Sequence, residues 1–225
     1  MLISVVTAAE TTYRGKFDQL SREFYQTGNK EEILEQLKDK QKDYEADTDY
    51  DNYVFQAEAE LLTGEIYEVL TAEEKAKKHF QQALEWAEKA LDQEKNYLTY
   101  RLHAEALSRL FNYRGTFFII RNSRQAANSL KEARERNPAD EMGLLIEAMY
   151  KLNAPAVAGG SIKEGQAILD EILKKDHPVL NFIVFHMKAE LAEGDNNQQE
   201  AQEFLDQAAQ IFPNSPLIGE INYIS

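Results

Sequence analysis

An acidic stretch has the residue types and spacing of a calcium-binding loop. The segment DTDYDNYVFQAE fits carboxylates to positions 1, 3, 5 and 12 of an EF-hand frame, on Asp47, Asp49, Asp51 and Glu58. Its sixth position holds Asn52 where glycine is usual, and asparagine tolerates the left-handed backbone next best. In the alternative interpretation a helix begins near Asn52, with Asp49 or Asp51 as its N-cap. We prefer this alternative, because a helix would move the carboxylates of the loop away from one another. Calcium binding is kept as a hypothesis to test.

A glycine-rich segment, Gly159-Gly160-Ser161, is a candidate phosphate site, since glycine-rich turns at helix N-termini bind anions. A P-loop needs Lys and Ser or Thr directly after its last glycine, whereas Gly165 is followed by Gln166 and Ala167. The sequence therefore favours a loop between helices, with Ser161 as the N-cap of the second helix.

Other catalytic and metal-binding patterns are missing from the sequence. It has no cysteine, which excludes thiolate zinc sites, iron–sulfur clusters and cysteine nucleophiles. Its four histidines share neither HExxH nor His-x3-His spacing, and no serine stands in a Gly-x-Ser-x-Gly elbow. We therefore expect a protein that is not an enzyme and needs no cofactor.

A basic island occupies residues 101–136. It contains eight Lys and Arg residues and three Glu, in a chain whose formal net charge is -14. Arginines beside aromatic side chains suit a protein or peptide partner with acidic or carboxylate groups. The candidate binding residues are Arg101, Arg109, Arg114, Arg121, Arg124 and Phe117. In the alternative, the aromatic side chains belong to the core and the arginines pair with acidic neighbouring helices.

The elements that position these residues are expected to be helices. The 225 residues include only five prolines and ten glycines, and Ala, Glu, Gln, Lys and Leu dominate. The strong negative charge opposes binding of nucleic acid, and no apolar run approaches the roughly 20 residues that span a bilayer. The composition predicts an all-α fold.

The first residues, MLISVVTAAE, are apolar and include Val6-Thr7-Ala8, which resembles the end of a signal peptide. A basic leader and a longer apolar stretch do not accompany it. The sequence leaves two localisations as alternatives: periplasmic or exported, with a trimmed signal, or cytoplasmic.

About ten helices are predicted from capping and stop signals. We expect Thr71 to cap the fourth helix, with Glu74 completing a capping box, and Pro138 to open the seventh. The tail 214–225 is expected to cover the last exposed groove with Leu217, Ile218, Ile221 and Tyr223. The expected ranges are about 11–26, 30–46, 52–70, 72–92, 96–113, 116–136, 138–152, from 161 onward, 178–194 and 198–212.

A pattern of small, large and small residues recurs in the second helix of successive pairs. Gly64 is expected to make room where the facing helix crosses, with Tyr67 packing one turn further on. A weaker copy of the pattern uses Gly165, Leu169 and Ile172. The clearer copies are Ala76-Phe80-Ala83, Ala126-Leu130-Ala133 and Ala201-Leu205-Ala208, the last two followed by Pro138 and Pro213.

This pattern resembles the tetratricopeptide repeat over about residues 52–213. The resemblance implies one domain in the form of a right-handed superhelix of antiparallel helix pairs, with a concave face. Residues 1–51 would form N-terminal helices, 52–213 the repeats and 214–225 a capping tail.

A narrower resemblance lies in YKLNAPAVAGGSIKEG, which with NSRQAANSLKEARERNPAD is similar to a group of bacterial, often exported, tetratricopeptide-type proteins. The function expected from these resemblances is a scaffold that binds a protein or peptide along its concave face. The alternative is an accessory protein of a bacterial envelope transport system that binds a small ligand in an enclosed pocket. The oligomeric state and the partner are left open.

Overall fold

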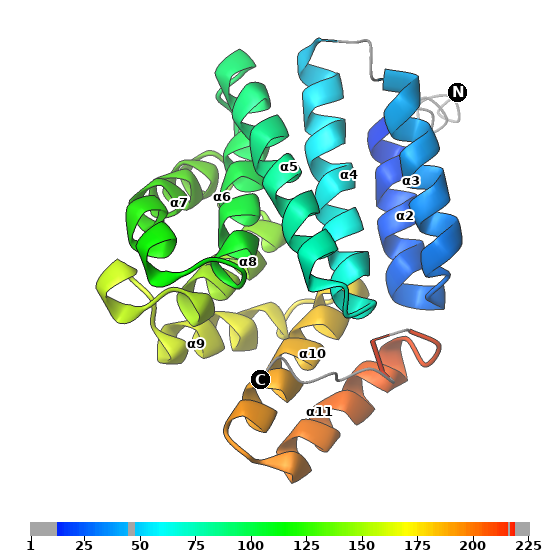
Figure 1. Ribbon diagram of the computed structural model, residues 1–225. Helices are drawn as coiled ribbons and strands as arrows, with labels where there is room; N and C mark the ends of the chain where they lie inside the picture. The colour runs from blue at the N-terminus through cyan, green and yellow to red at the C-terminus, as the bar shows by residue number, and fades with distance from the viewer. Residues whose placement is uncertain (1–12, 45–47, 216, 219–225) are drawn as a thin grey trace, which may run out of the picture.

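The computed structural model describes residues 13–44, 48–215 and 217–218, and within these ranges it is all-helical (Figure 1). The interpretations placed on residues 1–10, on Asp47 and on Ile221 and Tyr223 lie outside the described residues. The helices are α2 (Tyr13–Thr27), α3 (Lys30–Tyr44), α4 (Tyr50–Val69), α5 (Glu73–Gln93), α6 (Tyr97–Phe111), α7 (Thr116–Arg136), α8 (Glu141–Asn153), the 3-10 helix η1 (Ala156–Ala158), α9 (Ile162–Ile172), α10 (Pro178–Gly194) and α11 (Gln198–Ile211).

Two helix starts differ from the sequence prediction. Thr71 does not cap α5; the N-cap is Ala72, which makes no side-chain hydrogen bond there. Thr71 instead has a left-handed backbone, with φ 53°, and ends α4. Helix α8 begins at Glu141 with Asp140 as its N-cap, three residues after Pro138, because residues 137–140 form a turn first.

The turn at Thr71 has a counterpart near the C-terminus. The Thr71 N–H donates to Glu68 O at 2.9 Å, and the next N–H, of Ala72, donates to Tyr67 O at 2.9 Å. Between α10 and α11, Asn196 has φ 59°; its N–H donates to Glu193 O, and the next N–H, of Asn197, donates to Ala192 O, both at 2.8 Å. Both pairs of bonds form a Schellman motif. Thr71 and Asn196 lie 125 positions apart, as do Ala76 and Ala201, so the two helix pairs share the register of their turns.

The repeated small and large residues lie in the core, where α5, α7, α9 and α11 pack against neighbouring helices. A Cβ atom on Gly64 would lie 2.7 Å from Phe80 Cδ1 and 2.8 Å from Cζ, so a side chain there would overlap the ring. A Cβ atom on Gly165 would lie 2.7 Å from Leu152 Cγ, in α8. The buried members are Ala76, Phe80, Ala83, Ala126, Leu130, Ala133, Gly165, Leu169, Ile172, Ala201 and Ala208, and Leu205 is half-buried. The predicted role of Gly64 is confirmed.

The even-numbered helices form an inner layer. Helix α2 contacts α4, α4 contacts α6, α6 contacts α8 and α8 contacts α10. Helices α5, α7, α9 and α11 each pack beside one or two of these (Figure 1). Side chains from all five even-numbered helices line one cavity, which places the cavity on the inner side of the layer.

The two ends of the described chain meet. Phe24 and Tyr25 of α2 share a hydrophobic cluster with Phe182 of α10, and the Tyr25 and Phe182 rings are 6.2 Å apart. Leu217 and Ile218 of the C-terminal tail pack against the same cluster, as predicted for these two residues. This contact brings α2 and α10 together beside the inner cavity.

No helix among the described residues is both long and apolar enough to cross a membrane.

Candidate functional site

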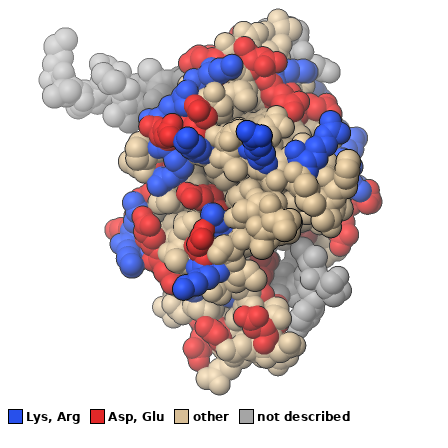
Figure 2. Space-filling model, turned by 90° about the vertical axis from the view of Figure 1, so that its left-hand side faces the viewer, with Lys and Arg blue, Asp and Glu red and all other residues tan. Residues whose placement is uncertain are grey.

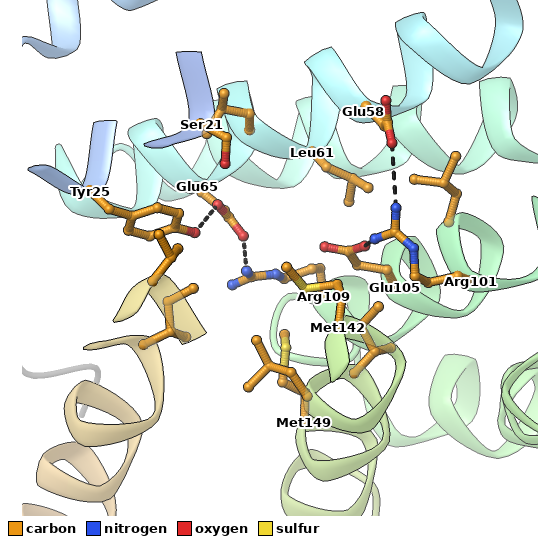
Figure 3. Close-up of a pocket in the computed structure, with 16 residues that line it drawn as sticks. Ser21, Tyr25, Glu58, Leu61, Glu65, Arg101, Glu105, Arg109, Met142 and Met149 are labelled. Atoms are coloured by element: carbon orange, nitrogen blue, oxygen red, sulfur yellow. Dashed lines mark hydrogen bonds and ion pairs between the residues drawn. The ribbon is translucent and has the colours of Figure 1, made fainter. Parts of the chain in front are cut away.

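The inner cavity has a volume of about 80 Å³ and one charged wall (Figure 3). The charged side chains come from α4 and α6. On α4, Glu58 and Glu65 are seven residues apart, and on α6, Arg101, Glu105 and Arg109 follow at intervals of four. These spacings place each set on one helix face, so the two helices oppose carboxylates and guanidinium groups across their contact.

Arg109 is the centre of the first ion cluster. Its guanidinium contacts Glu65 Oε1 and lies 3.1 Å from Glu68 Oε2. Two tyrosines add hydrogen bonds: Tyr25 donates to Glu65 at 2.8 Å, and Tyr113 donates to Glu68 at 2.7 Å. Burial raises the pKa of Glu68, while Arg109 and the Tyr113 hydrogen bond lower it in part. This cluster joins α2, α4 and α6.

Arg101 is the centre of the second ion cluster. It lies 3.4 Å from Glu58 and 3.2 Å from Glu105, and its Nε is 4.0 Å from Asp140 Oδ2 at the start of α8. Its side chain is only 12% exposed. Burial raises the pKa of Glu105, and the charge of Arg101 offsets part of this shift. Arg101 and Arg109 therefore bind carboxylates of their own chain.

The opposite wall of the cavity is apolar. In Figure 3, Met142 and Met149 of α8 lie across from Arg109 and Glu105. Further apolar side chains complete this wall: Leu145 and Ile146 of α8, and Val179 and Ile183 of α10. The cavity thus combines ionic and hydrocarbon surfaces.

The outer side of α7 carries a different surface, which we call the α7 surface: Phe117, Ile120, Arg121, Arg124 and Lys131. Phe117 is 82% and Ile120 is 53% exposed. Arg121, Arg124 and Lys131 are exposed as well, and the segment from Arg114 to Lys131 contains no Asp or Glu. Figure 2 views the side on which α7 and α9 lie, where Lys and Arg side chains border an uncharged area along its upper edge.

Five of the six residues predicted for partner binding therefore separate into two groups, and Arg114 belongs to neither. Arg101 and Arg109 lie at the inner cavity, whereas Phe117, Arg121 and Arg124 lie on the α7 surface. Arg114 is half-buried; it donates to Gln81 Oε1 at 2.8 Å and lies 5.5 Å from the Phe118 ring centre. The structure does not bring these six side chains together on one surface.

A groove of about 520 Å³ lies between α7 and α8, and Lys131 belongs both to its lining and to the α7 surface. Leu130 and Tyr150 form part of its floor. Its charged rim contains Lys131, Arg134, Lys151, Glu135 and Glu147.

From Asp49 onward the acidic stretch begins a helix, as the preferred interpretation expected. Asp49 is the N-cap of α4 and accepts a hydrogen bond from Asn52 N at 2.9 Å, while Asp51 lies in the first helical turn. Glu58 is nine residues beyond Asp49, which corresponds to roughly 13 Å along a helix at 1.5 Å per residue. Among the described residues, no group of three His, Cys, Asp or Glu side chains could hold a metal ion. The helix-start interpretation is confirmed for Asp49.

The glycine-rich segment is a tight connection between helices. A Cβ on Gly160 would overlap Ala154 O, and Gly159 has φ 93°. Ser161 accepts a hydrogen bond from Glu164 N at 3.3 Å, as predicted for the N-cap of α9.

The histidines occupy structural positions. His103 is buried with Nδ1 2.9 Å from Ser129 Oγ, and burial lowers its pKa to about 4. His79 lies 2.5 Å from Glu60, and His177 is the N-cap of α10. His186 lies 3.5 Å from Glu190.

Of the acidic side chains of the inner cavity, the sequence analysis missed Glu65 and Glu105 and named Glu58 only as a candidate calcium ligand. The available signal was the seven-residue spacing of Glu58 and Glu65, close to the eight-residue spacing of Arg101 and Arg109 on a later helix. Compared with known proteins, the chain matches no family model and no curated protein.

Proposed function

We propose that this protein is a non-catalytic scaffold, built as a tetratricopeptide-like right-handed superhelix of helix pairs. The fold part of this proposal is supported by the buried repeat positions and by the matching turns at Thr71 and Asn196. The function part rests on the α7 surface. The partner is a protein segment that carries apolar side chains and a cluster of Asp or Glu.

The observation that carries the proposal is the exposure of Phe117 beside unpaired arginines. Within the described part of the chain, Arg121 and Arg124 form no ion pair with an acidic side chain. An exposed phenylalanine and isoleucine beside them match the anchor residues of protein interfaces, in which aromatic side chains and arginine are enriched.

The proposal places the partner on α7 and in the adjacent groove instead of on the inner, concave side. The inner cavity of about 80 Å³ is too small for a peptide, and its arginines already bind carboxylates. The groove between α7 and α8 is larger and open to solvent, and on its rim Lys131, Arg134 and Lys151 pair with Glu135, Glu147 and Glu164, respectively. The groove therefore offers space for the partner, whose acidic side chains would approach Arg121 and Arg124 with favourable electrostatics.

The proposal is tested by affinity capture from the cells of origin. Wild-type protein is compared with Arg121→Glu/Arg124→Glu, and with Lys38→Glu/Lys78→Glu as a control that changes the net charge equally at exposed sites on α3 and α5. We expect a partner with an acidic segment to be retained by the wild type and the control and lost by the α7 variant. Equal retention by all three proteins would contradict the proposal, provided that their melting temperatures agree.

A further inference from the structure

We propose that a loop at η1, residues 152–162, completes the docking site on the α7 surface, and that the partner's segment is an amphipathic α-helix with an acidic flank, which lies across α7 and this loop. The inference rests on the scaffold proposal. It adds a second binding element and the conformation of the partner.

Exposed apolar side chains gather on the side of the molecule where α7 and α9 lie. In the described ranges, four of the five large apolar side chains that are exposed belong to α7, η1 and the start of α9. Val157 of η1 is 85% exposed, as much as Phe117, and Ile162 at the start of α9 is exposed as well. Because gathered apolar side chains on a surface mark interaction sites, this arrangement indicates a contact surface.

The composition of the η1 loop differs from that of the rest of the chain. Residues 152–162 contain no Asp, Glu, Lys or Arg, although 28% of the residues in the chain are charged. Charged side chains are depleted from the centre of protein interfaces. An uncharged loop that exposes Val157 and Ile162 therefore suits the centre of a docking site.

The η1 loop is joined directly to α7. Helices η1 and α7 are in contact, and the Tyr150 hydroxyl contacts both Ser123 O of α7, at 3.3 Å, and Ala158 O of η1. Ser123 lies three positions after Ile120, so the loop meets α7 about one helical turn from that exposed side chain. Figure 2 shows an uncharged area bordered by Lys and Arg on the side where both elements lie.

The η1 loop is held in one conformation by its own backbone. Ser161 N donates to Lys151 O at 2.7 Å, and Gly160 N donates to Pro155 O at 3.1 Å. These bonds close the loop before any partner binds. Its exposed apolar side chains are therefore presented at a small cost in conformational entropy.

The arrangement of the surface favours a helical partner. A helix presents an apolar stripe about 100° wide, which can contact two neighbouring elements at once. A strand needs a sheet edge, and the described residues form none. A polyproline segment needs a groove lined by aromatic side chains, and Phe117 is the one aromatic residue among the exposed large apolar side chains in the described ranges. The apolar contacts are Phe117 and Ile120 on α7, and Val157 and Ile162 on the loop.

Charge complementarity specifies the acidic flank of the partner helix. Phe117, Arg121 and Arg124 occur at i, i+4 and i+7, so one side of α7 presents the ring and both guanidinium groups. Asp or Glu beside the apolar stripe of the partner would form charge-assisted hydrogen bonds there. The charge of the whole chain argues against a membrane, because a formal net charge of -14 is repelled by anionic lipid headgroups.

The test uses three labelled peptides of about 18 residues, which is five helical turns. The first has leucines at i, i+3, i+4 and i+7 with glutamates beside them, the second scrambles this sequence, and the third has lysines in place of the glutamates. Binding to the intact protein is measured by fluorescence anisotropy at constant ionic strength. We expect the first peptide to bind at least about tenfold more tightly than the others, since one charge-assisted hydrogen bond contributes that much. Any other ranking, or no measurable binding of the first peptide, would overturn the inference.

Two variants separate this inference from the scaffold proposal. Val157→Ser/Ile162→Ser removes the apolar side chains of the loop, Arg121→Glu/Arg124→Glu reverses the charges on α7, and Leu70→Ser is the control at an exposed site after α4. We expect each double variant to bind the first peptide at least about tenfold more weakly, and the control to bind it unchanged. If only the charge-reversed variant loses affinity, the loop is not part of the site and the scaffold proposal stands. If neither loses affinity, both proposals fail.

Two further measurements test other occupants of the surface. Cosedimentation with phosphatidylcholine–phosphatidylserine vesicles that is lost in the loop variant would assign the surface to a lipid bilayer. A dimer in sedimentation velocity that the loop variant dissociates would assign it to a second copy of the chain. We expect wild type and variant to behave identically in both measurements, and either of these differences would overturn the inference.

Discussion

Arg101 and Arg109 of α6 and Arg121 and Arg124 of α7 belong to one basic island in the sequence but have opposite environments. The first two are 12% and 18% exposed, each with two or more carboxylates within 4.0 Å. The other two are exposed and lie beside an exposed phenylalanine. The difference follows from the layering, because α6 belongs to the inner layer and α7 packs outside it.

This comparison separates two uses of arginine in the same protein. An inner arginine compensates carboxylates that the fold has removed from water, so its removal leaves charges without partners. An outer arginine contributes little to stability and remains available to a partner. The following predictions, ordered by expected effect, test this division.

The largest effect is expected for Arg109→Ala. The substitution leaves Glu65 and Glu68 buried without their cation, and we expect it to lower the free energy of unfolding by about 3 kcal/mol or more. Urea unfolding followed by circular dichroism measures the change. A loss below about 1 kcal/mol would show that Arg109 resembles an exposed arginine.

The next effect concerns glycines inside and outside the core. Gly64→Ala places a Cβ against the buried Phe80 ring, so we expect a loss of about 1–3 kcal/mol. Gly194→Ala is the control, since no atom lies within 4 Å of its Cβ position. Its change should stay within about 1 kcal/mol, the size of the helix-propensity difference. Equal effects of the two substitutions would contradict the close packing of α4 and α5.

The third prediction is a pH dependence of the free energy of unfolding that originates at the charged wall of the inner cavity. Burial raises the pKa of Glu105 and Glu68 above the usual value of 4.5. Between the pKa of the unfolded state and the higher pKa of the native state, the native state therefore holds more protons. Their contribution to stability therefore falls as the pH rises above about 4.5. Glu105→Gln should reduce this fall, measured as the difference between variant and wild type at each pH.

The variant is compared with the wild type at each pH because His103 changes the stability with pH in the opposite direction. Its pKa is lowered to about 4, so its contribution to stability is lost as the pH falls from 6.5 toward 4. Comparing Glu105→Gln with the wild type leaves the His103 contribution common to both. Identical pH profiles of the two proteins would contradict the assignment to Glu105.

The smallest effect is expected on the α7 surface. Arg121→Ala and Arg124→Ala should each change the free energy of unfolding by less than about 0.5 kcal/mol, because neither side chain is buried or ion-paired in the described structure. The same urea experiment measures them beside Arg109→Ala. A loss above 1 kcal/mol at either position would assign that arginine a structural role.

Much of the fold was predictable from local signals. Helix starts follow from residues such as Asp49 and Ser161, and the close contact at Gly64 follows from the small residue facing Phe80. Thr71 was misjudged because threonine suits an N-cap, whereas the chain uses it in a left-handed position. No local signal marks the positive φ of a β-branched residue.

The site was less predictable, since it depends on contacts between helices. The charge of residues 101–136 revealed an island, but only the packing of α6 against α4 shows which arginines meet Glu58, Glu65 and Glu68. The closure of the cavity required the contact between Tyr25 and Phe182, which are 157 positions apart in the sequence.

The most direct test of the account is photo-crosslinking from the α7 surface. A benzophenone amino acid replaces Phe117, and in a control protein it replaces Leu70, which is 37% exposed at the turn after α4. We expect a crosslinked partner with an acidic segment from position 117 only, and its loss when Arg121→Glu/Arg124→Glu is added. Crosslinking of the same partner from position 70, or its persistence in the charge-reversed protein, would contradict docking at α7.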